Sequence, residues 1–364
     1  MSANRLDRLD SWRAICCLGV LWIHCWHLNA SLPIFILGFN IVKPFSILGN
    51  GVDFFFVISG FCMYYFYINK INKPSLQVYK DFILSRAYRI LPAYVVSLVV
   101  YTLILNSNWS LVKMIGIILA NIIFIQNFSS TLEVWSHFWS IAIEWHFYLI
   151  FPIIVYLNFN KLFFVRYFIA LTLAISLFGI FILSVYKQND LQLPVRFVEF
   201  AMGILMAYFY KSKNIRNVNK YFQLLSAFLL LFIGRLFNID SILNYSNSAI
   251  IYSIIKVSGY TIMTAGFALL LYLTIDYGSN IFKFLEWKPL VFIGRISYSF
   301  YLWHGIVVYY VWYYYTQHNQ MLQINLIAGW LMQFIISVMI TIPIAYLSYY
   351  FLEKKIKYKW AESK

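Results

Sequence analysis

Four ionisable side chains lie inside apolar stretches of the sequence, where they would act away from bulk water. Arg13 and His24 are separated by ten residues in one stretch, so a helix would place them on one face, about 16 Å apart. Asp53 and Glu144 lie about two turns inside two other stretches, GVDFFFVISGF and FWSIAIEWHFYLIFP. Charged groups at membrane depth are costly and by default mark a functional site.

Three of these side chains are suited to proton transfer. We expect His24, Asp53 and Glu144 to share one depth, because His24 ends its stretch near the face from which the other two enter. A carboxylate beside an imidazole fixes its tautomer and stabilises the imidazolium. His24 is therefore the candidate general base, with Asp53 or Glu144 to orient it. Taken singly, each could instead be a structural polar contact between helices.

A second group consists of arginines on the cytoplasmic side of the membrane, opposite the face near which His24 is expected. Arg86 and Arg89 are one turn apart in FILSRAYRILPAY, so their guanidinium groups could share one anion such as phosphate. The alternative is that they only set the membrane topology, although lysine would serve that purpose equally well.

Weaker candidates follow later in the chain. Arg196 and Glu199 are one turn apart and could pair with each other or contact substrate. Tyr298 and His304 could line a cavity or be satisfied by neighbouring helices. The four cysteines show no metal-ligand spacing, so no metal site is predicted.

The elements that must hold these residues are membrane-spanning helices. Hydrophobic residues make up 62% of the 364 residues and charged residues only 11%, which no soluble fold can accommodate. The apolar runs are long and continuous enough to cross about 30 Å of hydrocarbon as helices. We predict an all-α polytopic membrane protein with about ten helices in one bundle. The predicted spans are 12–29, 47–68, 88–105, 138–158, 162–186, 194–210, 221–238, 249–274, 296–316 and 322–351.

Charge in the loops predicts the topology. The net charge of +15 is spread through short loops, which indicates orientation in the membrane rather than nucleic-acid binding. If the short apolar piece 111–127 does not cross, the strongly basic loops all lie on the cytoplasmic side. A crossing would turn every later basic loop outward. We therefore predict that 111–127 is re-entrant or interfacial and that both termini are cytoplasmic.

Six stretches in order resemble the acyltransferase 3 family of bacterial membrane proteins from end to end. Arg13 and His24 match the family's spacing of Arg or Lys, ten residues and His, while Ser11 and Trp12 replace its usual glycine and Leu or Phe, which affects local packing only. The six stretches are LDSWRAICCLGVLWIH (9–24), GVDFFFVISGF (51–61), FILSRAYRILPAY (82–94), FWSIAIEWHFYL (138–149), RFVEFAMGILMAY (196–208) and IGRISYSFYLWH (293–304).

The resemblance implies that residues 1–364 form a single membrane domain of the bacterial inner membrane. It implies transfer of an acyl group, usually acetyl, from cytoplasmic acyl-coenzyme A to a hydroxyl of a carbohydrate or lipid-linked carbohydrate. Acetyl-coenzyme A would be a co-substrate, with its phosphates held by Arg86 and Arg89 and assisted by Arg13 and Arg295. His24 would deprotonate the acceptor hydroxyl or accept the acyl group itself.

The expected acceptor is a surface polysaccharide such as O-antigen, capsule or exopolysaccharide. Because the sequence ends at Lys364 just after the last span, we expect no additional soluble domain of the kind found in longer relatives. The alternatives are a polytopic transporter or a non-catalytic component of polysaccharide export. The sequence shows neither an inverted repeat nor matching broken spans, which disfavours a transporter.

Overall fold

The computed structural model describes residues 3–28, 35–36, 39–40, 48–68, 75–106, 108–159, 164–186, 190–212, 219–237, 248–276, 280–318 and 326–356. Every predicted span contains a helix. The helices are α1 (Ala3–Leu28), α2 (Gly51–Tyr67), α3 (Leu76–Leu105), α4 (Leu111–Ile122), α5 (Trp139–Phe159), α6 (Phe164–Tyr186), α7 (Leu193–Ser212), α8 (Lys220–Phe237), α10 (Ala249–Asp276), α11 (Lys288–Arg295), α12 (Ser297–His318) and α13 (Leu326–Ser348).

The remaining elements are short. Two-residue strands, β1 (Phe35–Ile36) and β2 (Phe39–Asn40), pair antiparallel. The 3₁₀ segments are η3 (Gln126–Phe128), η4 (Ser130–Leu132), η5 (Ser136–Phe138) and η6 (Asn280–Glu286), and a π-helical turn, η8 (Tyr349–Lys354), follows α13.

The predicted class, an all-α polytopic membrane protein, is confirmed. Within the described residues, seven helices are long and apolar enough to cross a membrane, and α11 with α12 makes an eighth if this pair, bent by 82°, is one span. The helices α1 and α2 are not among them, because α1 begins with the polar run ANRLDRLDSWR and α2 has 17 residues. The number ten therefore stays a prediction.

The ambiguous piece 111–127 forms a helix too short to cross. The twelve residues of α4 span about 18 Å, against about 30 Å of hydrocarbon. Beyond it the chain folds back, because the Asn121 amide donates to the carbonyl oxygen of Leu132 at 2.7 Å and the Gln126 amide donates to that of Phe138 at 3.3 Å. Polar side chains here bond the backbone that a continuing helix would have satisfied internally.

The chain divides into two compact units that are interleaved along the sequence. Unit 1 comprises Met1–Val52, Ala87–Ser110 and Asn280–Lys364, and unit 2 comprises Asp53–Arg86 and Leu111–Ser279. The predicted single membrane domain stays a prediction.

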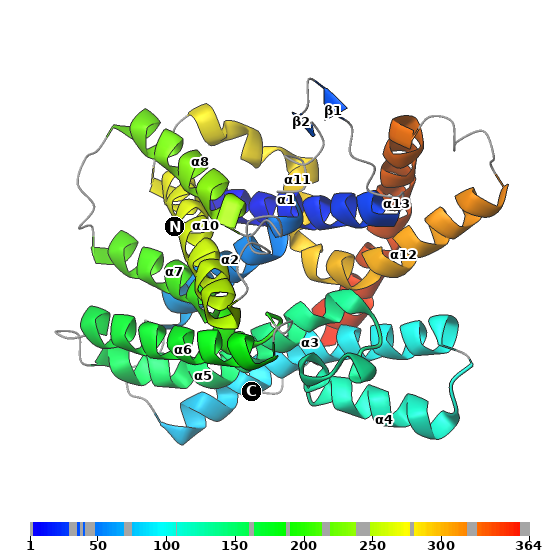
Figure 1. The fold of residues 1–364 in the computed structure, drawn as a ribbon, viewed down its shortest axis with the longest axis horizontal. Coiled ribbons are helices and arrows are strands. Elements are labelled where there is room, and N and C mark those ends of the chain that lie inside the picture. The colour runs from blue at the N-terminus through cyan, green and yellow to red at the C-terminus, as the bar shows by residue number, and fades with distance from the viewer. Residues whose placement is uncertain are drawn as a thin grey trace. The chain divides into compact units, whose positions relative to one another are not determined.

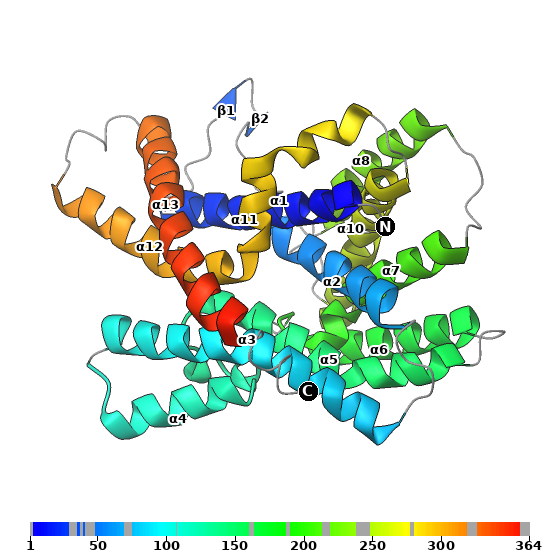
Figure 2. The same cartoon turned by 180° about the vertical axis from the view of Figure 1, so that it is seen from behind.

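In unit 1, α1 packs against α11, α12 and α13, and α12 packs against α13 (Figure 2). The crossing of α1 and α11 is close, because a Cβ at Gly294 would collide with the backbone of Asp10. The Tyr101 hydroxyl of α3 donates to the carbonyl oxygen of Leu302 at 2.9 Å and accepts the Ile306 N–H at 2.8 Å. These contacts fix the turn of α12 that carries His304.

In unit 2, α10 packs along α8 and also contacts α6 and α7, while α5 lies against α6 and α7 (Figure 1). The backbones of α2 and α7 touch at two glycines: a Cβ at Gly60 would collide with the backbone of Phe200, and one at Gly203 with that of Val57. This close crossing brings Asp53 on α2 beside Arg196 on α7.

Candidate active site

The central contact of unit 1 joins two histidines. Nδ1 of His24 on α1 lies 3.0 Å from Nε2 of His304 on α12, and the two ring planes are 29° apart with their centroids 5.0 Å apart. His304 is 1% exposed, and its Nδ1 lies 2.6 Å from the carbonyl oxygen of Tyr301. The prediction that Asp53 or Glu144 orients His24 stays a prediction. The structure places the imidazole of His304 at hydrogen-bond distance from Nδ1 of His24.

Two arginines predicted to bind phosphate, Arg13 on α1 and Arg295 at the end of α11, contact the same carboxylate of α1. Arg13 donates to Asp10 at 2.8 Å, and Arg295 donates to Asp7 at 3.0 Å and lies 3.8 Å from Asp10. Asp10 therefore contacts both guanidinium groups. An incoming phosphate would have to compete with these carboxylates for Arg13 and Arg295.

Tyr298, predicted to line a cavity, bonds within unit 1. Its hydroxyl donates to the carbonyl oxygen of Ile90 at 2.9 Å, which ties α12 to α3. This contact supports the alternative interpretation, in which neighbouring helices satisfy the tyrosine.

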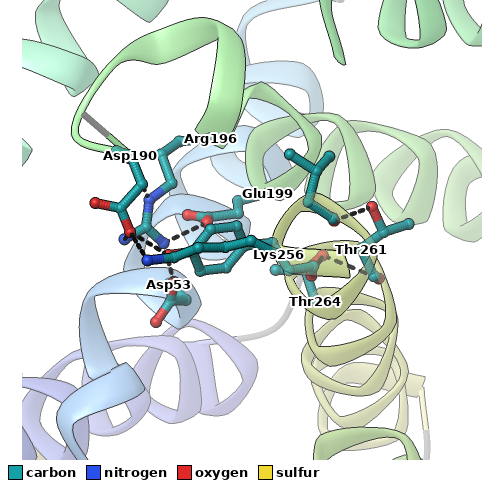
Figure 3. A network of polar contacts seen from close by, with 9 residues as sticks. Asp53, Asp190, Arg196, Glu199, Lys256, Thr261 and Thr264 are labelled. Atoms are coloured by element: carbon teal, nitrogen blue, oxygen red, sulfur yellow. Dashed lines mark hydrogen bonds and ion pairs between the residues drawn. The ribbon is translucent and has the colours of Figure 1, made fainter. Parts of the chain in front are cut away.

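Unit 2 contains a buried ionic network centred on Arg196 (Figure 3). One guanidinium nitrogen, Nη1, donates to Asp53 at 2.5 Å and to Glu199 at 2.8 Å. The guanidinium also stacks on the ring of Tyr260, with Cζ 3.9 Å from the centroid. The sequence predicted the pairing of Arg196 with Glu199, and the structure adds Asp53 to it.

The network extends to α10 through Asp190. The Nζ of Lys256 lies 2.9 Å from Oδ2 of Asp190, and the Tyr260 hydroxyl donates to the same oxygen at 2.6 Å. Burial alone would raise the pKa of the Asp190 carboxyl, but Arg196 and Lys256, with the Tyr260 hydrogen bond, outweigh it and lower that pKa. Asp190 is thus held as an anion that bridges α7 and α10.

Glu144 has different hydrogen-bond partners from those of Asp53. Its Oε1 accepts hydrogen bonds from Tyr148 at 2.5 Å and from Ser59 at 3.2 Å. Ser59 lies six residues beyond Asp53 on α2, about 9 Å along the helix axis. Glu144 therefore contacts α2 about one and a half turns away from Asp53. That the two carboxylates share one depth in the membrane stays a prediction.

Arg86 and Arg89 have different surroundings, although they are one turn apart on α3. Arg89 is exposed, whereas Arg86 is 7% exposed and has its Cζ 4.6 Å from the ring centroid of Tyr67 and 5.8 Å from that of Tyr148. Arg86 donates to the Tyr67 hydroxyl, and its Nε has no hydrogen-bond partner. Within the described parts of the chain, no carboxylate lies within ion-pair distance of this buried guanidinium.

Sequence reasoning missed several partners. Asp190 and Lys256 bind each other although 66 positions separate them, and Lys256 lies inside an apolar span, which was a signal of function or pairing. Asp7 and Asp10 were missed because they lie near the N-terminus before the apolar run. Over the described residues, no cluster of three His, Cys, Asp or Glu side chains is arranged to hold a metal ion.

Comparison with known proteins identifies the family of this chain. The model described as an acyltransferase domain matches residues 6–350. The chain belongs to the acyltransferase 3 family. The predicted resemblance is thereby confirmed, and its motifs place His24, Asp53, Glu144, Arg196 and His304 inside the matched region.

Three staphylococcal proteins represent the similar sequences. "Putative O-acetyltransferase SACOL0978" of Staphylococcus aureus strain COL and "Putative O-acetyltransferase MW0856" of strain MW2 are each 27% identical over 379 residues, covering 95% of this chain and 56% of the relative. "O-acetyltransferase OatA" of strain NCTC 8325 / PS 47 is 25% identical over 390 residues, covering 98% of this chain and 58% of the relative. The chain thus spans little more than half the length of these relatives. No solved structure matches it.

Proposed function

We propose that this chain transfers an acetyl group from cytoplasmic acetyl-coenzyme A to a hydroxyl of a surface carbohydrate. Membership of the acyltransferase 3 family supports acyl transfer, and the names of the relatives support acetyl transfer to oxygen. We place the protein in the bacterial inner membrane, as its family resemblance implies, with both termini cytoplasmic, as the distribution of basic loops predicts.

The buried guanidinium of Arg86 carries the donor assignment. An ion buried without a counter-ion is costly, so a site that keeps one is suited to an anionic ligand. The donor's phosphates are such anions, and arginine binds phosphate through charge-assisted hydrogen bonds. Arg86 has an unused Nε donor for this purpose. In this proposal Arg89, exposed one turn away, assists it at the membrane surface.

The chemistry assigned to His24 is proton transfer. The imidazole removes the proton of the acceptor hydroxyl while that oxygen bonds to the carbonyl carbon of the thioester. The carbon–sulfur bond then breaks, and the imidazolium returns the proton to the leaving thiolate. The products are the carbohydrate ester and free coenzyme A, so atoms and charge balance without a metal or an oxidant.

Envelope carbohydrate from cells with and without the gene tests the acceptor class. We expect acetyl esters to be lost from one surface polysaccharide when the gene is deleted, and restored by the wild-type gene but not by a His24→Ala gene. The measurement is mass spectrometry of the released glycans before and after mild alkali, which removes O-acetyl groups. Unchanged acetylation in the deletion strain would contradict a carbohydrate acceptor.

Replacement of Arg86 tests the donor site. Arg86→Gln should raise the KM for acetyl-coenzyme A by roughly 10-fold to 100-fold, because a charged hydrogen bond contributes about 1.5–3 kcal/mol. The assay follows initial rates of transfer of labelled acetyl by the purified protein in proteoliposomes.

Acetyl-pantetheine, which lacks the phosphates, provides the internal control for this variant. With this donor Arg86→Gln and the wild type should have similar KM values. Arg166→Gln is the matched surface control, because Arg166 is an exposed arginine on α6, and it should leave the KM for both donors unchanged. An equal penalty for Arg86→Gln with both donors would show that Arg86 does not bind phosphate.

A further inference from the structure

The contact between His24 and His304 fixes where the hydrogen atoms of both rings must lie. Nδ1 of His304 is 2.6 Å from the carbonyl oxygen of Tyr301 on the preceding turn of α12. A carbonyl oxygen only accepts hydrogen bonds, so this Nδ1 must carry the hydrogen. In the neutral ring, Nε2 of His304 then presents a lone pair.

The same reasoning passes to the second ring. Nε2 of His304 lies 3.0 Å from Nδ1 of His24, and one of these two nitrogens must donate. Because Nε2 of His304 accepts, Nδ1 of His24 donates. The neutral ring of His24 consequently has its lone pair on Nε2, the nitrogen on the far side of the ring from His304.

We propose that His304 is a positioning residue that holds His24 in the tautomer with hydrogen on Nδ1, so that Nε2 of His24 takes the proton of the acceptor. This inference rests on the proposed function of His24 as the general base. It assigns His304 a role different from the predicted contact with substrate.

Burial suits His304 to this role. The residue is 1% exposed and its orientation is set by a backbone carbonyl, which cannot rotate as a side chain can. When Nε2 of His24 gains a proton, the bond from Nδ1–H to His304 becomes charge-assisted and strengthens. In other proton-transfer sites a carboxylate orients the histidine ring and stabilises the imidazolium. The neutral imidazole of His304 would do the same for His24 without burying a negative charge.

The tautomer can be observed directly. The full chain, labelled with ¹⁵N-histidine and reconstituted in lipid bilayers, contains six histidines, and His24→Gln identifies the signals of His24 by their loss. Solid-state NMR at a pH at which the His24 imidazole is uncharged should show a protonated Nδ1 and an unprotonated Nε2 for this residue. A protonated Nε2 and an unprotonated Nδ1 would overturn the proposal, whatever the activity of any variant.

Two variants of His304 test whether this residue positions His24 or only fills space between the helices. His304→Gln can place an amide oxygen near the position of Nε2 and accept from His24, whereas His304→Leu fills similar space without an acceptor. His304→Leu should lower kcat on the order of 100-fold with little change in the KM for acetyl-coenzyme A. His304→Gln should recover kcat to within about tenfold of the wild type. Equal kcat losses in both variants, with both proteins folded, would contradict the positioning role.

Failure of this inference is distinguishable from failure of the proposed function. If His24→Ala retains transfer, the general-base assignment fails even where the NMR tautomer is as expected. If His24→Ala is inactive but the His24 ring carries its hydrogen on Nε2, only the role of His304 fails.

Discussion

His24→Ala should reduce acetyl transfer by about 10²-fold to 10⁴-fold, the range that a positioned general acid–base group contributes. Alanine removes the nitrogen that takes the acceptor proton and leaves the contact to His304 on α12 unmade. The measurement is the initial rate of transfer from labelled acetyl-coenzyme A in proteoliposomes, at equal amounts of membrane-inserted protein. In the same assay a transporter or a non-catalytic export component would transfer no acetyl even as the wild-type protein, so the wild-type rate decides between the classes of function.

A control in the same chain accompanies this prediction. His146 lies on α5, and His146→Gln should keep the wild-type rate, because its ring packs beside Phe128, with centroids 6.3 Å apart, outside the polar groups described above. A wild-type rate for His24→Ala would end the base assignment. If His24 instead accepts the acetyl group, intact-protein mass spectrometry without acceptor should show acetylated protein that His24→Ala does not form.

Arg196→Met should destabilise unit 2 by about 3–5 kcal/mol, the cost of breaking a buried ion pair by removing one partner. The guanidinium contacts Asp53 at 2.5 Å and Glu199 at 2.8 Å, and Arg196 is 6% exposed. Without it, two buried carboxylates lose their closest cation. The Tm of the detergent-purified protein should fall on the order of 10 °C.

Glu199→Gln is the matched control for Arg196→Met. The network contains more carboxylates than cations: Asp53, Asp190 and Glu199 face Arg196 and Lys256. Removing the charge of Glu199 leaves each remaining carboxylate with a cation, so the stability should change by less than about 1 kcal/mol. A wild-type Tm for Arg196→Met, or an equal loss in both variants, would contradict the view that Arg196 holds the network together by neutralising it.

The two largest effects thus concern different units and different properties. His24 is expected to affect the rate of transfer, whereas Arg196 is expected to affect folding of the helices that carry it. Any loss of transfer in Arg196→Met should therefore accompany its loss of Tm and recover when the protein is assayed at low temperature, whereas the loss in His24→Ala should not.

The sequence by itself determined the class of the protein and the residues worth testing. Long apolar runs can satisfy their backbone only as helices, so α5 (Trp139–Phe159) and α10 (Ala249–Asp276) follow from composition and length. Contacts within one helix were equally accessible: Arg196 and Glu199, one turn apart, do pair. The charge of the loops also predicted that 111–127 would not cross the membrane, and the helix α4 there has only twelve residues.

Only the tertiary structure decided which of these side chains meet. His304 follows His24 by 280 positions and Arg196 follows Asp53 by 143, and no periodicity within one helix indicates such partners. They depend on how helices cross, and the crossing of α2 and α7 depends on the missing Cβ atoms of Gly60 and Gly203. Helix periodicity fixes the face on which a residue lies, but the rotation and height of the neighbouring helix are set by packing. For this reason the contact of Glu144 with Ser59 on α2 could be found only in the structure.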